Sequence, residues 1–419
     1  MEILKCYTQT PFVRIERPRG TRDFLPDEME KRRAIEKVMR RIAESYGYRE
    51  VLTPTFEHLE LFTIKSGEGI VEEIYAFKDK SGRDLALRPE LTAPVMRMYV
   101  NECMGMPKPL RFYYFANCFR YERPQKGRYR EFWQFGVELI GSDSYLADVE
   151  VISLAYEIMS ALNIKFDLHV GHVGLLRHVL RDLDEKVAGK IMRLIDKKDL
   201  DTLDSYINEI GREDLKEVVY PLIELVGDTD IIEEAREIIP DFDFTHIEKV
   251  AKTLDDLGVE FKIDLGIARG LDYYTGIVFE AYAEGLGAQN QICGGGSYRL
   301  AHLFGGDDVP ATGFALGFDR IAEICEVDVE KPTKVVIVSF RGLEKEALKI
   351  ANAIRSKAVT ITDVMERSVK KQLSFANDIS ADYAVIVGEK ELKEGKIAVK
   401  NLRTQEQSVM TLDEFLNKL

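Results

Sequence analysis

Alternating apolar and polar positions near residue 120 predict two strands joined by a basic loop. The first strand covers residues 110–121, and the return strand carries Gln134, Gly136 and Glu138 on one face, because side chains alternate along a strand. The loop at 122–130 contains four cations, a proline and a glycine, as hairpin connections often do. A glycine between Gln134 and Glu138 predicts room for a ligand beside the backbone.

The side chains of this hairpin indicate a ligand with a phosphate at one end and a small polar group at the other. Arg120 stands at the end of the first strand, where a guanidinium forks onto phosphate oxygens. A solvated hairpin with a charged tip is the alternative interpretation, so further motifs are needed to choose between the two.

Three later stretches add candidate chemistry. Residues 268–280 join two apolar runs and contain Arg269, which either serves a ligand or pairs with Asp272. Residues 291–298 contain three consecutive glycines, a pattern more typical of a turn. Residues 311–320 read as a strand leading into a helix. Its last residue, Arg320, would oppose the helix dipole unless it shares an anion with the helix N-terminus.

In this order and spacing the four stretches resemble the histidyl-tRNA synthetase family of class II aminoacyl-tRNA synthetases. The resemblance covers nearly the whole chain, and its most specific part is Arg269-Gly-Leu-Asp-Tyr-Tyr274, which other class II enzymes lack. The helix at 27–46 with the strand around Pro54 is similar to the first class II motif, and residues 89–92 match the amino-acid-binding turn. In one departure, the family's Gly-Gly-Arg-Tyr-Asp is replaced by a sequence with Ser297 and Arg299.

The resemblance implies an α+β fold with a class II antiparallel-sheet catalytic core, a helical insertion and a C-terminal α/β anticodon-binding domain. It implies that L-histidine reacts with ATP to give histidyl-adenylate and pyrophosphate, and that histidine then passes to the 3′ end of histidine tRNA. Mg²⁺ would arrive with ATP, and the protein itself would supply no metal site. A homodimer formed through the first motif is also implied.

The same resemblance assigns roles to individual residues. A carboxylate and a phenol would recognise the two polar edges of the imidazole, and three arginines would face the reacting anions. The implied catalytic residues are Arg120, Arg269 and Arg320. The implied histidine-binding residues are Glu90, Thr92, Arg120, Gln134, Glu138, Arg269, Tyr273, Tyr274 and Tyr298. The implied ATP-binding residues are Arg120, Glu122, Arg128, Tyr129 and Arg320.

Composition narrows the class of protein. With 419 residues, 45% of them hydrophobic and 31% charged, the chain is expected to form two or three globular domains. Neither a membrane span nor a signal peptide is expected, because no sufficiently long apolar run occurs. Five scattered cysteines without a Cys-x-x-Cys pair predict a reducing, cytoplasmic setting and no zinc site. His169 and His172 fit strand-end histidines better than a metal pair.

Charge and periodicity predict how the chain is divided. Residues 333–419 contain 15 Lys and Arg against 12 Asp and Glu, so this part is +3 and the remainder of the −14 chain is −17. Because local charge governs contact with phosphate, this favours RNA binding by the C-terminal part, although any single lysine equally fits a solvated surface. The predicted parts are a catalytic core at 1–173 and 258–331, a helical, acid-rich insertion without strand signals at 174–257, and an α/β domain at 332–419.

Other classes of protein compete with this interpretation. The regulatory subunit of ATP phosphoribosyltransferase resembles the synthetase core, but it lacks the C-terminal domain and usually loses the signature residues. Synthetases for proline, threonine or glycine share the C-terminal domain but not the motif at 269–274. A degenerate RNA-sensing module would be expected to lose Arg120 or Arg320. This chain keeps all of these features, which favours the histidine family.

Overall fold

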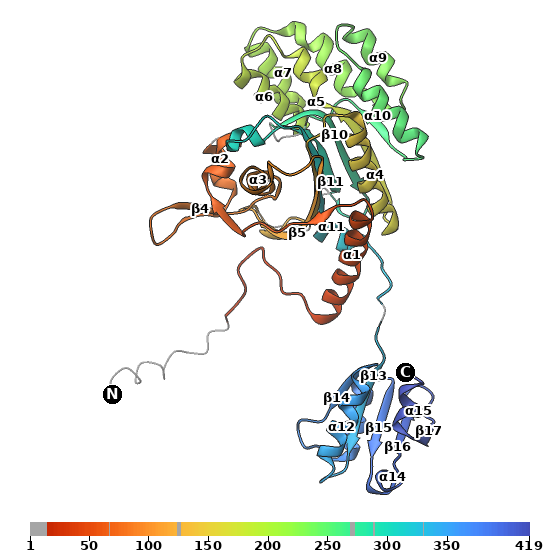
Figure 1. The fold of residues 1–419 in the computed structure, drawn as a ribbon. Coiled ribbons are helices and arrows are strands. Elements are labelled where there is room, and N and C mark those ends of the chain that lie inside the picture. Colours follow the sequence, from red (N-terminus) through yellow and green to blue (C-terminus); the bar gives the residue numbers. More distant parts are fainter. Residues whose placement is uncertain (1–14, 67, 124–126, 269–272, 288–289, 330) are drawn as a thin grey trace, which may run out of the picture. The chain divides into compact units, whose positions relative to one another are not determined.

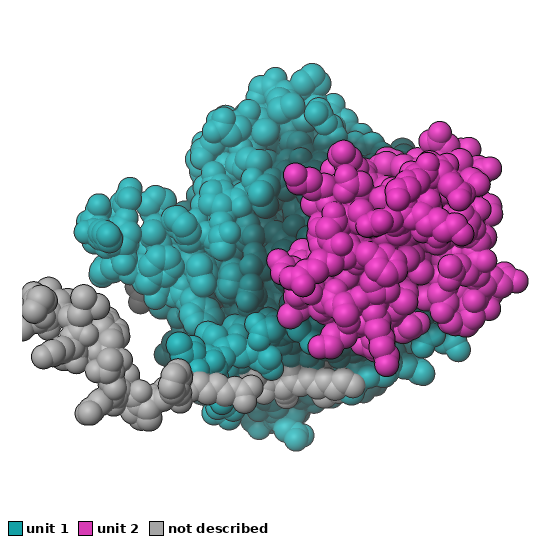
Figure 2. All heavy atoms as spheres, turned by 90° about the horizontal axis from the view of Figure 1, so that it is seen from below, with its two compact units in different colours: residues 1–328 teal, residues 329–419 magenta. Residues whose placement is uncertain are grey.

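The computed structural model describes residues 15–66, 68–123, 127–268, 273–287, 290–329 and 331–419. Contacts divide the chain into two compact units, 1–328 and 329–419 (Figure 2). Each unit has its own buried hydrophobic residues. The finer division predicted within the first unit stays a prediction. No helix in the described ranges is both long and apolar enough to span a bilayer.

The first unit is built on a sheet of nine described strands in the order β1-β5-β6-β12-β11-β10-β7-β9-β8 (Figure 1). Its centre is antiparallel, as predicted, whereas β1 pairs parallel with β5 and β9 pairs parallel with β7. The strands are β1 (Arg49–Glu50), β5 (Leu110–Phe119), β6 (Glu131–Ile140), β7 (Phe166–His172), β8 (Val226–Gly227), β9 (Lys262–Asp264), β10 (Tyr274–Ala283), β11 (Gln291–Tyr298) and β12 (Ala311–Gly317). A smaller sheet contains β2 (Phe56–His58), β4 (Asp84–Leu87) and β3 (Ala76–Lys78).

The two faces of β6 have different neighbours because its side chains alternate. Phe135 and Val137 belong to the hydrophobic core. Tyr113, which pairs with Val137 across the hairpin and stacks on Phe135, donates a hydrogen bond to Glu44 of the first helix at 2.8 Å. The helices α1 (Pro26–Ser45) and α4 (Tyr145–Ala161) lie beside the sheet (Figure 1). The opposite face of β6 is thereby left for the site.

The first helix, α1, starts one residue before the predicted position. It begins at Pro26 after Leu25, whose N–H donates to Glu28 at 3.3 Å. Ile35 and Met39 are fully buried within the single chain. Both side chains therefore belong to the chain's own hydrophobic core.

Short helices gather beyond β7 at one end of the first unit (Figure 1). They are α5 (Val173–Val179), α6 (Glu185–Asp196), α7 (Leu200–Glu209), the 3-10 helix η3 (Glu213–Leu215), α8 (Lys216–Glu224), α9 (Ile231–Ile238) and α10 (Thr245–Asp256). Contrary to the expectation of no strand here, β8 lies between α8 and α9 and extends the sheet edge beside β9. A strand of two residues is too short to show alternation in the sequence.

The remaining helices that the structure describes in the first unit are α2 (Glu60–Ser66), the 3-10 helix η1 (Glu68–Glu73), α3 (Thr92–Met98), the π-helix η2 (Tyr99–Cys103), the 3-10 helix η5 (Ala301–Phe304) and α11 (Phe318–Ile324). Among them, α11 packs against β6, β11 and β12, and η2 and η5 pack against α3. Helix α11 follows β12 directly, as predicted, so Arg320 lies in its first turn.

The three consecutive glycines lie inside β11 rather than in a turn. A Cβ atom on Gly295 would stand 2.4 Å from the Gly313 carbonyl oxygen and 2.6 Å from the Phe279 ring. A Cβ on Gly296, where φ is +151°, would stand 2.4 Å from the Ile277 oxygen. The glycines are required because neighbouring strands and a phenyl ring occupy the space that side chains would fill.

The second unit is a small α/β domain, as predicted. Its sheet has the order β14-β13-β15-β16-β17, with the first three strands parallel. On β13, Val335 and Ile337 belong to one core, and Val336 and Val338 belong to another, because side chains alternate along the strand. The elements are β13 (Lys334–Ser339), α12 (Glu344–Ile354), β14 (Val359–Thr362), α13 (Val369–Asp378), β15 (Tyr383–Val387), α14 (Glu389–Lys393), β16 (Ile397–Asn401), β17 (Gln407–Met410) and α15 (Leu412–Leu416).

Candidate active site

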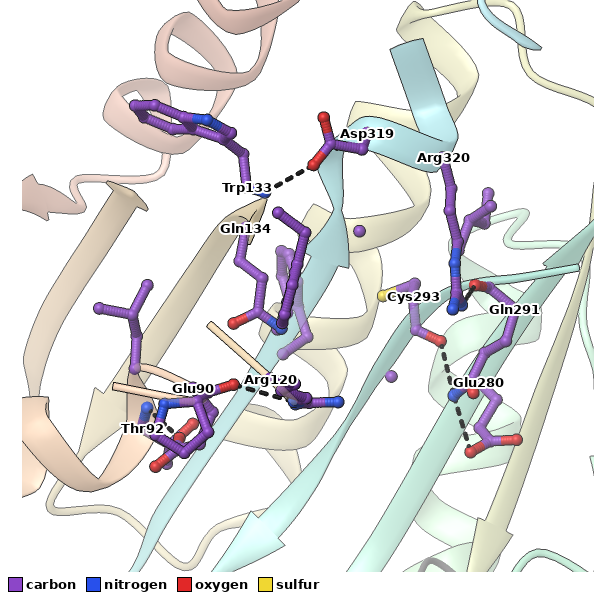
Figure 3. Close-up of a pocket in the computed structure, with 18 of the residues that line it drawn as sticks. Glu90, Thr92, Arg120, Trp133, Gln134, Glu280, Gln291, Cys293, Asp319 and Arg320 are labelled. Atoms are coloured by element: carbon purple, nitrogen blue, oxygen red, sulfur yellow. Dashed lines mark hydrogen bonds between the residues drawn. The ribbon is translucent and has the colours of Figure 1, made fainter. Parts of the chain in front are cut away.

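A cavity of about 510 Å³ lies in the first unit (Figure 3). It is lined by strands of the central sheet, by the turn that precedes α3 and by the first turn of helix α11. It brings together residues separated by more than two hundred positions in the chain. The predicted site residues that line it are Glu90, Thr92, Arg120, Glu122, Arg128, Tyr129, Gln134, Glu138, Tyr273, Tyr274, Tyr298 and Arg320. Arg269, also predicted, lies outside the described residues.

The amino-acid-binding turn is organised by Glu90. Its carboxylate accepts hydrogen bonds from the backbone N–H groups of Thr92, at 2.5 Å, and Ala93, at 3.1 Å, at the start of α3. Burial raises the pKa of Glu90, and these hydrogen bonds partly oppose that shift. Arg120 is tied to the same turn, because its Nε donates to the Pro89 carbonyl oxygen at 3.0 Å. Figure 3 shows Glu90, Thr92, Arg120 and Gln134 on one side of the pocket.

Glu138 is a buried carboxyl group held by two phenols. Tyr298 donates to its Oε2 at 2.6 Å, and Tyr114 lies 3.3 Å from its Oε1. Only 1% of Glu138 is exposed, and burial raises its pKa to about 8, although the hydrogen bonds from Tyr298 and Thr92 lower it. The rings of Tyr273 and Tyr298 meet edge to face at 5.7 Å. This end of the pocket therefore combines a titratable carboxyl group with aromatic walls.

Gly136 serves a different purpose from the one predicted. A Cβ atom there would lie 2.4 Å from the hydroxyl end of the Tyr114 side chain. The space beside the backbone is thus filled by Tyr114 and not left for a ligand. This packing lets Tyr114 reach Glu138, a contact that sequence reasoning missed. The alternation along β5 does place Tyr114 opposite Gly136, which was the available signal.

The other side of the pocket concentrates positive charge. Arg320 donates from Nε to the Gly127 oxygen at 3.0 Å and from one η nitrogen to the Gln291 oxygen at 2.6 Å. Burial lowers the pKa of Arg320, and the guanidinium groups of Arg128 and Arg120 lower it further. Cations that repel one another inside a partly buried cavity suit a ligand with several negative charges.

Residues of the hairpin loop are held close to α11. Arg128 forms an ion pair with Glu122. The Tyr129 hydroxyl donates to Glu323 of α11 at 2.8 Å, and the Arg22 guanidinium lies 3.4 Å from the centre of the Tyr129 ring. Tyr129 is therefore tied to the helix that carries Arg320.

Asp319 is a residue of the site that sequence reasoning missed. It is 4% exposed and lies between three elements. It accepts from the backbone N–H of Trp133 at 2.6 Å, from Arg32 of α1 at 2.7 Å, and pairs with Arg22 at 2.5 Å. The position next to Arg320 was the only signal in the sequence. Its contacts hold the helix that carries Arg320.

Glu280 and Gln291 were also missed. Both line the pocket, and they lie on the same side as Arg320 and Cys293 (Figure 3). Gln291 donates from Nε2 to Glu280 at 2.9 Å, and the Tyr282 hydroxyl donates to the same carboxylate. In the sequence, the signal for Glu280 was a carboxylate within the apolar run that forms β10. In the described residues no group of three His, Cys, Asp or Glu side chains is arranged to hold a metal ion.

Comparison with known proteins decides the family. The family model described as "Histidyl-tRNA synthetase" matches residues 20–321. The chain belongs to the histidyl-tRNA synthetase family. A second model, "Anticodon binding domain", matches residues 334–419. The recognition made from the sequence motifs is confirmed.

Individual members of the histidyl-tRNA synthetase family are similar over nearly the full length. The histidine–tRNA ligase of Archaeoglobus fulgidus is 64% identical over 97% of this chain and 100% of its own. That of Methanosarcina acetivorans is 54% identical over 97% of this chain and 98% of its own. The crystal structure of histidyl-tRNA synthetase from Nostoc sp. covers 97% of this chain and 100% of its own, with a TM-score of 0.78 and 25% identity. The predicted fold class is confirmed.

Proposed function

We propose that this chain, an ATP-dependent histidine–tRNA ligase, performs both steps of its reaction around the polar pocket. First, an oxygen of the histidine carboxylate attacks the α-phosphorus of ATP, and pyrophosphate leaves as histidyl-adenylate forms. The 3′-terminal hydroxyl of histidine tRNA then attacks the carbonyl carbon, and AMP leaves. The observation that carries the assignment of the pocket is Glu138, a buried carboxyl group between two phenols in the same cavity as three guanidinium groups.

Histidine binds through its two polar ends. The α-ammonium group is a hydrogen-bond donor only, so it needs acceptors. The Glu90 carboxylate, the Gln134 amide oxygen and Thr92, in the same turn as Glu90, accept its hydrogen bonds. Glu138 binds one imidazole nitrogen, and Tyr274 binds the other. The phenols of Tyr273 and Tyr298 complete the polar and aromatic wall. Such a site discriminates against analogues because they would leave buried polar groups without partners.

ATP binds on the side that carries the arginines. Arg120 contacts the α-phosphate and the histidine carboxylate, and Arg320 contacts the γ-phosphate. Glu122, Arg128 and Tyr129 cover the nucleotide from the hairpin loop. Arg269 completes the set beside the reacting carboxylate. Mg²⁺ would enter with ATP and would neutralise part of the charge on its phosphates.

The C-terminal unit reads the anticodon of the tRNA. Lys370, Lys371, Lys390 and Lys393 are exposed on its helices and suit phosphate contacts. Unpaired bases would be read by stacking and by contacts to their edges. Arg403, in the same unit, is paired with Asp382 at 2.5 Å and is less suited to this role.

The protein acts as a homodimer in the cytoplasm. Among the described residues, the strand predicted around Pro54 is absent, because this residue lies in the connection between β1 and β2. Apolar side chains on either side of it support the assembly, since Leu52 is 75% exposed and Phe56 is 54% exposed in the single chain. Light scattering at working concentration should give about twice the single-chain mass of 47.8 kDa. A mass equal to that of one chain would contradict the dimer.

Pyrophosphate exchange across the amino acids tests the proposed reaction, and histidine alone should stimulate it. Glu138→Gln should raise the KM for histidine roughly tenfold to a hundredfold while the KM for ATP changes less than about twofold, because the proton-sharing hydrogen bond between the carboxyl group and the imidazole is lost. Glu131→Gln is the matched control, since Glu131 lies on the same strand outside the pocket. Equal increases in both KM values would make Glu138 a structural residue.

A further inference from the structure

A second polar cluster joins the sheet to the helices beyond β7. Asp148 of α4 is 4% exposed, and its Oδ1 accepts a hydrogen bond from the Ser297 hydroxyl at 2.6 Å. Its Oδ2 lies 2.8 Å from Nε2 of His246 on α10. A buried carboxylate is costly unless both oxygens have partners, and here the two partners come from β11 and from α10. One side chain therefore ties three elements together.

This cluster borders a separate cavity of about 240 Å³. His172 and Thr312 also line it, and within the described residues His172 Nδ1 and Thr312 Oγ1 have no hydrogen-bond partner. The cavity leaves room beside Ser297, so small changes in side-chain volume there need not force the backbone to move. The effect of a substitution in this cluster can therefore be attributed to the hydrogen bond that it removes.

One member of the cluster, Ser297, is next in the sequence to Tyr298, which lines the proposed histidine pocket. Ser297 precedes Tyr298, and successive side chains on a strand point to opposite faces, so Ser297 faces α4 while Tyr298 reaches Glu138 at 2.6 Å. Gly296 has no side chain to anchor this end of β11. The hydrogen bond from Ser297 to Asp148 links this end of the strand to α4, and the Thr275 hydroxyl also donates to the Ser297 carbonyl oxygen at 3.4 Å.

We propose that Asp148 and His246 are positioning residues for histidine recognition. Through Ser297 they hold the end of β11 where Tyr298 donates to Glu138. Neither residue lines the substrate pocket, so their effect passes through Tyr298. Helix α10 then helps to set the affinity for the amino acid. The inference rests on the proposed role of Glu138 in binding the imidazole.

Ser297→Ala in the full-length protein is the main test, because it removes the hydroxyl and little volume. The KM for histidine should rise roughly fivefold, while kcat and the KM for ATP stay within about twofold. Ser297→Thr retains the hydroxyl and should keep the KM for histidine near that of the unaltered protein. Asp148→Ala removes both acceptor oxygens and should raise it at least as much, and adding Ser297→Ala to Asp148→Ala should change it less than about twofold, because the Ser297–Asp148 contact is already lost.

His246→Leu should raise the KM for histidine roughly threefold, because Asp148 loses one of its two partners. His178→Leu is the matched control, since His178 pairs with Asp241 at 3.0 Å in the same group of helices and should leave the KM unchanged. Tyr298→Phe and Glu138→Gln serve as references. If Glu138→Gln raises the KM but Ser297→Ala and Asp148→Ala do not, the positioning role is wrong. If Glu138→Gln has no effect, the proposed histidine site itself fails.

Discussion

At the scale of single residues, the protonation state of Glu138 controls how the pocket binds the imidazole ring of histidine. Burial raises the pKa of this carboxyl group to about 8, so the ligand-free protein keeps the proton at neutral pH. Free histidine carries a side chain with an ordinary pKa of about 6.5. We expect the complex to hold one titratable proton between the Glu138 carboxylate and the ring nitrogen that faces it, whichever of the two groups carries it.

This shared proton predicts a bell-shaped pH dependence of histidine binding. Below about pH 6.5 free histidine must release a proton on binding, and above about pH 8 the complex must take one up, so affinity falls about tenfold per pH unit on either side. Calorimetry between these limits and beyond them measures both slopes. Glu138→Gln should lose only the decline above pH 8. Affinity that keeps rising through pH 8 would instead mean that ionised Glu138 binds a neutral ring.

At the scale of elements, the closeness of β5, β6 and β12 depends on Gly136. A Cβ atom there would lie 2.4 Å from Tyr114 and 2.6 Å from the Phe314 carbonyl oxygen. Gly136→Ala should therefore lower the free energy of unfolding by roughly 1–3 kcal/mol and raise the KM for histidine as Tyr114 is displaced. Gly105→Ala is the control, because nothing lies within 4 Å of a Cβ at that position. Equal stability of both variants in urea would contradict this packing.

The junction of α1, β6 and α11 depends on Asp319. Its carboxylate is bound by Arg32, by Arg22 and by the Trp133 backbone N–H. Removing its negative charge therefore leaves these two guanidinium groups without their counterion. Asp319→Asn should lower the free energy of unfolding by about 3 kcal/mol and raise the KM for ATP through movement of Arg320. Asp23→Asn, in an exposed pair with Arg17 at 3.6 Å, should cost less than about 1 kcal/mol. A small loss for Asp319→Asn would make this network unimportant for stability.

At the scale of the whole molecule, the two compact units predict that the two halves of the reaction can be separated. The described residues of the proposed histidine and ATP sites all lie in unit 1, whose hydrophobic core contains no residue of unit 2. A chain ending at Asp328 should still form histidyl-adenylate in pyrophosphate exchange. It should charge tRNA poorly, and its tRNA affinity should fall less steeply with salt, because phosphate contacts are lost. Unchanged charging would move tRNA recognition into unit 1.

The sequence by itself determined the features that depend on near neighbours along the chain. Alternation along β6 was enough to place Gln134 and Glu138 on one face, since strand periodicity is a local property. The order and spacing of motifs were enough for the family, and the resemblance named twelve of the residues that line the pocket. The start of α1 was one residue off because the N–H of Leu25 is satisfied by Glu28, a choice that residue preferences do not reveal.

Tertiary structure decided what depends on segments that are distant in the chain. Asp319 meets Arg32 across 287 positions, and Asp148 meets Ser297 across 149, so no local pattern shows either contact. The same reason explains the glycines: the Tyr114 side chain fills the space at Gly136, and Phe279 and the neighbouring strands fill the space along β11. Periodicity records which face a side chain takes, whereas the path of the folded chain determines what lies opposite that face.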